Sequence, residues 1–212
     1  MPQELTPELL LYAYRQGAFP MAADQHDDQL YWFDPEMRGI LPLDRFRMSR
    51  SLARRIRTTT FQVTLNRAFD AVVAGCAARD KTWINTPIAR LFGQLHGQGH
   101  AHSLEIWEGE KLAGGVYGLA LGGLFCGESM FSRRVDASKI ALAFLVVHLR
   151  RCGFSLFDTQ YLTEHLASLG GVEIPRAQYH ALLETALQQD ADITRHPVPG
   201  VHEVLQLRTQ RS

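Results

Sequence analysis

The sequence is poor in features that would place it outside the class of ordinary globular proteins. Its three cysteines, Cys76, Cys126 and Cys152, form no CxxC pair and lie in apolar segments. We therefore expect buried free thiols in a reducing compartment rather than disulfides. No apolar run approaches the ~20 residues that span a bilayer, and the N-terminus has neither the basic nor the apolar region of a secretory signal. These absences predict a cytoplasmic protein with no membrane attachment.

Charge of either sign is not in excess. The formal net charge is zero, with 46% hydrophobic and 21% charged residues, as in soluble globular proteins. A surface for nucleic acid would therefore be a local patch and not a general field. The 212 residues suffice for one large domain, or for a main domain with a small appendage. No internal repeat or low-complexity tract is visible.

The spacing of apolar residues predicts an α+β fold, because helices precede an antiparallel meander and further helices surround one buried strand. The meander occupies 101–129, with turns at 108–111 and 121–123. Residues 22–29 read as a polar loop, and 31–43 as an aromatic turn leading into a short strand. Helices are predicted at 6–16 with Thr6 as N-cap, 49–57 with Ser49 or Ser51, 67–79, 86–99 with Thr86, 136–153 with Asp136 or Ser138, 163–170 and 175–189; further strands are predicted at 61–66, 154–160 and 201–207.

A glutamate interrupts the apolar strand that precedes the helix at 136–153. Strand alternation would point Phe125 and Gly127 to one face, and Cys126 and Glu128 to the other. A carboxylate at this place is partly desolvated unless it meets a cation. Glu128 therefore either forms a structural ion pair with one of the two arginines at 133–134 or lines a site.

The segment "FDTQ" places two polar residues at the end of a buried strand. Asp158 and Gln160 are two residues apart, so they would share one face of that strand. A carboxylate beside an amide can orient and polarise an incoming amine. The alternative is an aspartate that caps a helix or a turn.

A third feature is basic. The stretch "RFRMSRSLARRIR", residues 45–57, contains six arginines and no acidic residue. Arg47, Arg50, Arg54 and Arg57 have the spacing of one stripe along a helix. Such a stripe can follow the phosphates of a nucleic acid, or it can be a solvated helix face.

Two weaker features are a histidine cluster and a loop tryptophan. His96 and His100 have helical metal-ligand spacing, with His102 nearby, but the glycines at 97 and 99 indicate that the helix ends there. We therefore expect no metal. Trp83 lies in a loop before a helix, where an indole serves either as an apolar lid or as a stacking platform for a nucleobase.

Together these residues resemble one family, the leucyl/phenylalanyl-tRNA–protein transferases. The matching motifs run in order from about residue 12 to residue 176, so the resemblance covers most of the chain. They are "AYRQGAFPM", "WFDPEMRGILPL", "TWI", "GHAHSLEIW", "GGVYG", "LFCGESMFSR", "DASKIAL", "FDTQ" and "HLASLGGVEIPR". The resemblance implies a GNAT-like acyltransferase domain at 37–212 with a small N-terminal domain at 1–36 packed on it.

The resemblance also implies a reaction. The family moves Leu or Phe, and Met less well, from aminoacyl-tRNA to the α-amino group of proteins that begin with Arg or Lys, which marks them for N-end-rule degradation. Because the aminoacyl ester is already activated, no metal or cofactor is required. Asp158 and Gln160 match the proposed catalytic pair, in which Gln160 would hydrogen-bond the attacking amine. Asp158 would polarise the amine or help to take its proton, unless a tRNA ribose hydroxyl relays that proton.

Further positions take their expected roles from the same resemblance. Glu128 would lie at the substrate pocket and meet the cationic acceptor, Trp83 would contact the terminal adenosine, and Tyr14 would contact substrate. The four arginines of the stripe would bind tRNA. The apolar donor pocket would consist of Val116, Phe125, Met130, Leu145, Leu149 and Phe157.

The chain also departs from the family pattern. It lacks a stretch like "NGLLA.GGDL" ahead of the first helix, has Met21 where relatives often have Trp, and has Thr159 where some have Cys. These departures concern N-terminal tRNA contacts more than the reaction. The alternatives are a non-catalytic RNA-binding module, a zinc hydrolase and an acetyl-CoA-type acyltransferase. The last would need a glycine-rich basic turn, and "SRRVDAS" contains no glycine.

Overall fold

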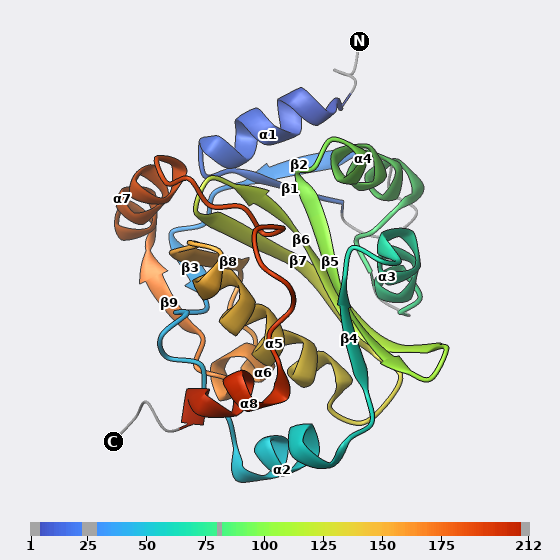
Figure 1. Cartoon of the computed structure of the whole chain (residues 1–212). Coiled ribbons are helices and arrows are strands. Elements are labelled where there is room, and N and C mark those ends of the chain that lie inside the picture. The colour runs from blue at the N-terminus through green and yellow to red at the C-terminus, as the bar shows by residue number, and fades with distance from the viewer. Residues whose placement is uncertain (1–4, 23–28, 80–81, 209–212) are drawn as a thin grey trace.

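The computed structural model of the chain describes residues 5–22, 29–79 and 82–208 (Figure 1). Most of the polar loop predicted at 22–29 lies outside these residues. The helices are α1 (Pro7–Arg15), α2 (Arg50–Thr58), α3 (Phe69–Ala77), α4 (Thr86–Gly97), α5 (Ala137–Arg151), α6 (Glu164–Ser168), α7 (Arg176–Leu187) and α8 (Val201–Leu205), followed by a 3₁₀ turn at Gln206–Arg208. The strands are β1 (Phe19–Ala22), β2 (Leu30–Phe33), β3 (Met37–Ile40), β4 (Gln62–Leu65), β5 (Ala101–Glu108), β6 (Lys111–Leu121), β7 (Leu124–Ser132), β8 (Leu156–Gln160) and β9 (Val172–Pro175).

The strands form two sheets. A seven-stranded sheet has the order β4-β5-β6-β7-β8-β3-β9, and β1 and β2 form a two-stranded sheet of their own. The meander β5-β6-β7 is antiparallel as predicted, whereas β7 and β8 pair in parallel. The mixed sheet with helices around it confirms the predicted α+β class.

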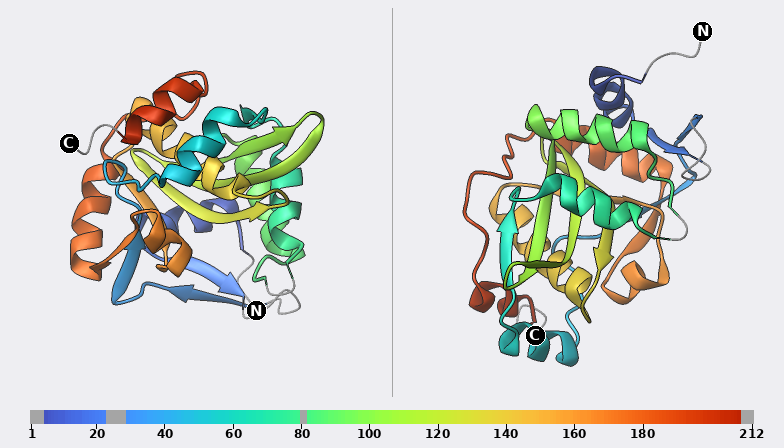
Figure 2. Two further views of the ribbon diagram at one scale, coloured as in Figure 1. Left: turned by 90° about the horizontal axis from the view of Figure 1, so that it is seen from below. Right: turned by 90° about the vertical axis from the view of Figure 1, so that its right-hand side faces the viewer.

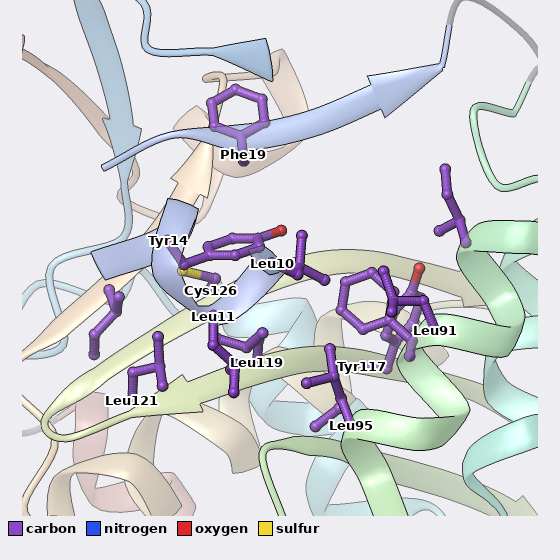
Figure 3. Packing of buried hydrophobic residues seen from close by; sticks show 14 of the residues in the cluster. Leu10, Leu11, Tyr14, Phe19, Leu91, Leu95, Tyr117, Leu119, Leu121 and Cys126 are labelled. Atoms are coloured by element: carbon purple, nitrogen blue, oxygen red, sulfur yellow. The ribbon is translucent and has the colours of Figure 1, made fainter. Parts of the chain in front are cut away.

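Helices cover both faces of the large sheet. Figure 2 shows α3 and α4 across one face, and residues of α1 and α7 belong to the same apolar cluster. The other face is covered by α5, with α2 and α8 packed beside it at the end of the molecule opposite α1 (Figure 1). In Figure 3 Leu10, Leu11 and Tyr14 of α1 lie over Leu119 and Leu121 of β6. The N-terminal helix is thus anchored to the sheet by its apolar side.

Most predicted helix ends are confirmed, and one cap is not. The side chains of Thr6 and Ser49 accept hydrogen bonds from the backbone of their own first turns. The cap of α4 is Asn85 rather than Thr86, since Asn85 Oδ1 accepts from the Ile88 N–H at 2.9 Å. Asp136 precedes α5 with a φ of 65° and makes no side-chain cap bond.

The predicted strand at 201–207 is wrong. Residues 201–205 form α8, which begins where the Glu203 carboxylate accepts from the Gly200 N–H at 2.8 Å. Alternation over so few residues does not distinguish a strand from one helical turn with a single buried side. The antiparallel pair β1–β2 and the edge strand β9, each four residues long, were not predicted.

The prediction of free, buried cysteines is confirmed for all three. Among the described ranges, no helix combines the length and apolar character that a membrane crossing requires.

Candidate functional site

The candidate site lies where two parallel strands separate. β7 and β8 pair through Leu124–Leu156, Phe125–Phe157 and Cys126–Asp158. β7 then continues to Ser132, while β8 ends at Gln160. A cavity of about 230 Å³ opens there, lined by residues of β1, β6, β7, β8, α5 and α6. It is smaller than the roughly 300–1,000 Å³ that enclose a drug-sized ligand, so it suits one side chain and its reacting group.

A β-bulge places Glu128 at this cavity. Tyr117 of β6 pairs with Ser129 and the next residue, Gly118, pairs with Gly127, so Glu128 is the extra residue of β7. The regular alternation predicted for this strand therefore breaks at Glu128. Bulges re-aim side chains beside active sites, and this one turns the carboxyl group to the cavity wall.

A second irregularity positions Gln160. Gly39 of β3 pairs with Gln160 and Ile40 with Asp158, so Thr159 is skipped. Gln160 has a φ of 58°, a left-handed conformation that costs a residue other than glycine about 1–3 kcal/mol. The Asp158 carboxylate accepts the Gln160 N–H at 2.9 Å and so holds this conformation.

Asp158 is buried and fully engaged. It forms a two-pronged ion pair with Arg38, with Nε to Oδ1 at 2.9 Å and Nη2 to Oδ2 at 2.6 Å. The Tyr179 hydroxyl donates to Oδ2 at 2.8 Å. Burial opposes the charge of Arg38, but its hydrogen bonds and charge interaction with Asp158 prevail and raise its pKa. Asp158 does not line the cavity, whereas Gln160 does.

Among residues 5–22, 29–79 and 82–208, no cationic side chain bonds Glu128. The Tyr14 hydroxyl donates to its Oε1 at 2.7 Å. Burial raises the pKa of Glu128 to about 8; the Tyr14 hydrogen bond opposes this shift, while the nearby Asp158 charge adds to it. The predicted ion pair with an arginine at 133–134 is wrong, because Arg134 pairs with Glu108 at 2.7 Å and Arg133 lies over the Phe131 ring.

The amide of Gln160 faces Glu128. In one orientation Nε2 lies 3.4 Å from Glu128 Oε1. Hydrogen bonding favours the other, in which the nitrogen donates to the carbonyl oxygens of Thr159 and Gly127 at 3.0 and 3.1 Å. The amide oxygen then points toward Glu128 and can accept a hydrogen bond from an amine.

The rest of the cavity wall is apolar. Of the predicted pocket residues, Val116, Met130 and Phe157 line it. Phe125, Leu145 and Leu149 are buried in the core behind it and are not part of the wall. Leu142 and Leu166 were missed. Leu142 lies one helical turn before Leu145 in α5, so its spacing could have indicated it.

Aromatic and basic side chains complete the rim. Trp83 and Met21 both line the cavity, as does Tyr161. Arg79 donates to the Ser129 hydroxyl at 2.6 Å beside them. Tyr14 reaches the site only through Glu128, from beneath the cavity wall.

The arginine stripe is shorter than predicted. Arg50, Arg54 and Arg57 are exposed on α2, but Arg47 precedes the helix, and its N–H donates to the Leu169 carbonyl. Among residues 5–22, 29–79 and 82–208, none of the four forms a salt bridge. Figure 1 shows α2 at the end of the molecule opposite α1.

The histidines make contacts with the turn between α4 and β5. His96 stacks on Phe69 at 4.2 Å and bonds the Ala101 carbonyl, while the two ring nitrogens of His102 contact Asn66 and the Gly99 carbonyl. Within the described part of the chain, no group of three or more potential ligands is arranged to hold a metal.

Comparison with known proteins identifies the family. The sequence model described as leucyl/phenylalanyl-tRNA protein transferase matches residues 40–184, and that of its N-terminal domain matches 3–36. The chain belongs to this family. It is accordingly a transferase.

Individual relatives are similar in sequence to this chain over nearly its full length. A Cereibacter sphaeroides protein named leucyl/phenylalanyl-tRNA–protein transferase is 60% identical over 191 residues, which are 90% of this chain and 89% of that protein. A Ruegeria sp. protein of the same name is 54% identical over 208 residues, covering 98% and 99%. Among solved structures, L-PGS from Bacillus licheniformis is similar with a TM-score of 0.42 and 14% identity, covering 76% of this chain and 55% of that one. That likeness is too distant to assign a fold family.

Proposed function

We propose that this chain moves Leu or Phe, and Met less well, from aminoacyl-tRNA to the α-amino group of proteins that begin with Arg or Lys. The observation that carries the proposal is one small cavity with an apolar wall on one side and the Gln160 amide and Glu128 carboxyl on the other. The product would enter N-end-rule degradation. Because charged tRNA is used in the cytoplasm, we propose that the chain acts there.

The apolar wall suits the donor side chain. Val116, Met130 and Phe157 offer contacts to Leu or Phe, while a charged side chain would lose its hydration without compensation. The cavity volume of about 230 Å³ leaves no room for a much larger group. Specificity for the donor would thus come from shape and polarity at this wall.

The polar wall suits the acceptor amine. An α-amino group has a pKa of about 7.7–8.0, close to the value of about 8 to which burial raises the pKa of Glu128. A proton can therefore pass between the ammonium and Glu128 at little cost, which leaves a neutral amine beside the Gln160 amide oxygen. The amine nitrogen then attacks the ester carbonyl carbon, the bond to the ribose oxygen breaks, and the proton that the attacking nitrogen loses passes to that oxygen as it leaves.

The donor ester is already activated, so positioning supplies much of the rate. Holding amine and ester together can contribute ~7–11 kcal/mol at best. The prediction that Asp158 takes the amine proton stays a prediction; its burial favours an indirect role through Gln160. A ribose hydroxyl of the tRNA remains the alternative proton relay.

The remaining surface suits tRNA. Trp83 at the rim offers a ring on which the terminal adenine can stack. The exposed arginines of α2 offer positive charge for phosphates. We also propose a GNAT-like domain at 37–212 and a smaller domain at 1–36. The separate β1–β2 sheet, which ends at Phe33, supports this boundary.

A transfer assay tests the proposal. Radiolabelled Leu or Phe on tRNA is offered with two peptides, one beginning with Arg and one with Ala. We expect label on the Arg peptide alone. Label on neither peptide would overturn the proposal, and tRNA binding without transfer would favour an RNA-binding module.

A further inference from the structure

Arg38 is the largest fully buried side chain, and its contacts place it directly behind the cavity. Its two nitrogens Nε and Nη2 bind the Asp158 carboxylate, and Nη1 donates to the Gly17 carbonyl at 2.8 Å. A buried charge is tolerated only when it is paired and hydrogen-bonded. Asp34, four residues earlier, lies 3.9 Å from Nη1, whereas the close two-pronged pair is made with Asp158, 120 residues away along the chain.

The plane of this guanidinium is fixed by two aromatic rings. Its central carbon lies 4.5 Å from the centroid of Phe19 and 4.3 Å from that of Tyr179. Phe19 belongs to β1 and Tyr179 to α7, so both ends of the chain contribute to the clamp. A planar fork held in this way also fixes the plane of the carboxylate that it binds.

The acceptor sites of Asp158 are then filled. Oδ1 accepts from Arg38 Nε and from the Gln160 N–H, and Oδ2 accepts from Arg38 Nη2 and from the Tyr179 hydroxyl. An ionised carboxylate offers about four lone-pair sites, so none remains for a substrate amine. Asp158 instead fixes the conformation of Gln160. Its hydrogen bond with the Gln160 N–H holds the left-handed backbone that directs the Gln160 amide toward the cavity.

We infer that Arg38 is a positioning residue of the transfer reaction, acting through the chain Arg38–Asp158–Gln160. This inference rests on the proposed function. It assigns Arg38 no contact with substrate. Replacing Arg38 would allow the Asp158 carboxylate to rotate, and the Gln160 amide would then no longer be held toward the cavity. Both substrates would still bind.

The test is a double-mutant cycle on kinetics with Arg38→Met, Asp158→Asn and the double variant, with Arg176→Met as control. Arg176 contacts the same N-terminal segment through the Asp34 carbonyl but does not contact Asp158. We expect kcat to fall about 100-fold in each single variant, as for a misplaced catalytic group, with KM for tRNA and peptide little changed. The double variant should be no slower than the worse single variant. In ¹⁵N NMR spectra the Gln160 amide should shift and exchange faster in Arg38→Met.

If Arg38→Met fails to fold, the double variant, which leaves neither charge unpaired, carries the test together with Tyr179→Phe. The inference is overturned by a folded Arg38→Met with wild-type kcat or by a double variant with wild-type kcat. It is also overturned if the reductions of kcat in the two single variants multiply in the double variant. A wild-type enzyme that transfers nothing would instead refute the proposed function.

Discussion

Asp158 and Glu128 are carboxyl groups on neighbouring strands of one sheet, yet their surroundings differ in nearly every respect. Asp158 has no exposed surface and holds a buried arginine in a two-pronged ion pair. Glu128 lies in a bulge at the cavity wall, with a tyrosine hydroxyl and an amide as neighbours. One carboxyl group is saturated by the protein, and the other is left for a ligand.

In the proposed mechanism, this difference assigns positioning to Asp158 and proton transfer to Glu128. Arg38 compensates the buried Asp158 inside the protein, so Asp158 can fix the backbone of Gln160. Among the described residues no cation bonds Glu128 directly, and burial raises its pKa to about 8 although the charge of Arg38 acts against this shift. Under the proposed function, the N-terminal cation of the acceptor would supply this charge.

The largest expected effect is on stability at Asp158. Asp158→Ala leaves the buried Arg38 cation unpaired and should lower the free energy of unfolding by roughly 3–5 kcal/mol. Glu128→Ala should cost less, about 1–3 kcal/mol, since it leaves the buried Tyr14 hydroxyl without its acceptor but breaks no ion pair. Urea unfolding of both variants measures the difference. Equal losses of unfolding free energy in the two variants would contradict the difference described between Asp158 and Glu128.

The second prediction concerns pH and Glu128. Between about pH 4.5 and 8 the unfolded chain has lost the Glu128 proton while the folded chain keeps it, so this group lowers stability as pH rises. Glu128→Gln removes the effect. Its melting temperature relative to wild type should therefore rise from pH 5 to pH 8 and level off above. A difference that stays constant across this range would show that the pKa is not raised.

The apolar wall opposite Glu128 gives a third, smaller effect. Val116→Phe narrows the cavity and should reduce kcat/KM for Phe-tRNA more than for Leu-tRNA. The ratio of the two kcat/KM values should change by about 10–200-fold. Leu149→Val, in the core behind the wall, serves as control and should leave the ratio unchanged. Competition between Phe-tRNA and Leu-tRNA for transfer measures this ratio of kcat/KM values. An unchanged ratio in Val116→Phe would show that the donor side chain does not bind against Val116.

The smallest effect lies far from both carboxyl groups. Replacing Arg50 and Arg54 by Ala should weaken tRNA binding and reduce the slope of log K against log salt by roughly 1 for each arginine. Arg195→Ala is a matched control, because Arg195 pairs with Asp190 on the surface. Filter binding at several salt concentrations gives the slopes. A slope equal to wild type would exclude α2 from the tRNA surface.

Sequence reasoning found the polar residues of the site but not their arrangement. Glu128, Asp158 and Gln160 stood out because they interrupt apolar strands. The two bulges that separate their roles are properties of strand pairing and leave no local signal. Strict alternation therefore placed Asp158 and Gln160 together, whereas only Gln160 reaches the cavity.

Arg38 shows the same limit. Its segment "MRGILPL" reads as a turn entering a strand, and its partners lie far along the chain. The local signal was an arginine in an apolar strand, with Asp34 four residues earlier as a neighbour 3.9 Å from its Nη1. The meander and the long helix at 136–153 were predictable because each repeats its period many times, and the short elements β1, β2 and α8 do not.

The most direct test of the division between the two carboxyl groups is single-turnover transfer by Glu128→Gln. Wild type and Glu108→Gln, a surface control that only loses its pairing with Arg134, are measured beside it with Leu-tRNA and an Arg-initial peptide. We predict that Glu128→Gln transfers about 10²–10⁴-fold more slowly while binding Leu-tRNA normally, as for loss of a proton-accepting group. A rate equal to wild type would contradict the account, because Glu128 would then neither receive the amine proton nor meet the acceptor cation.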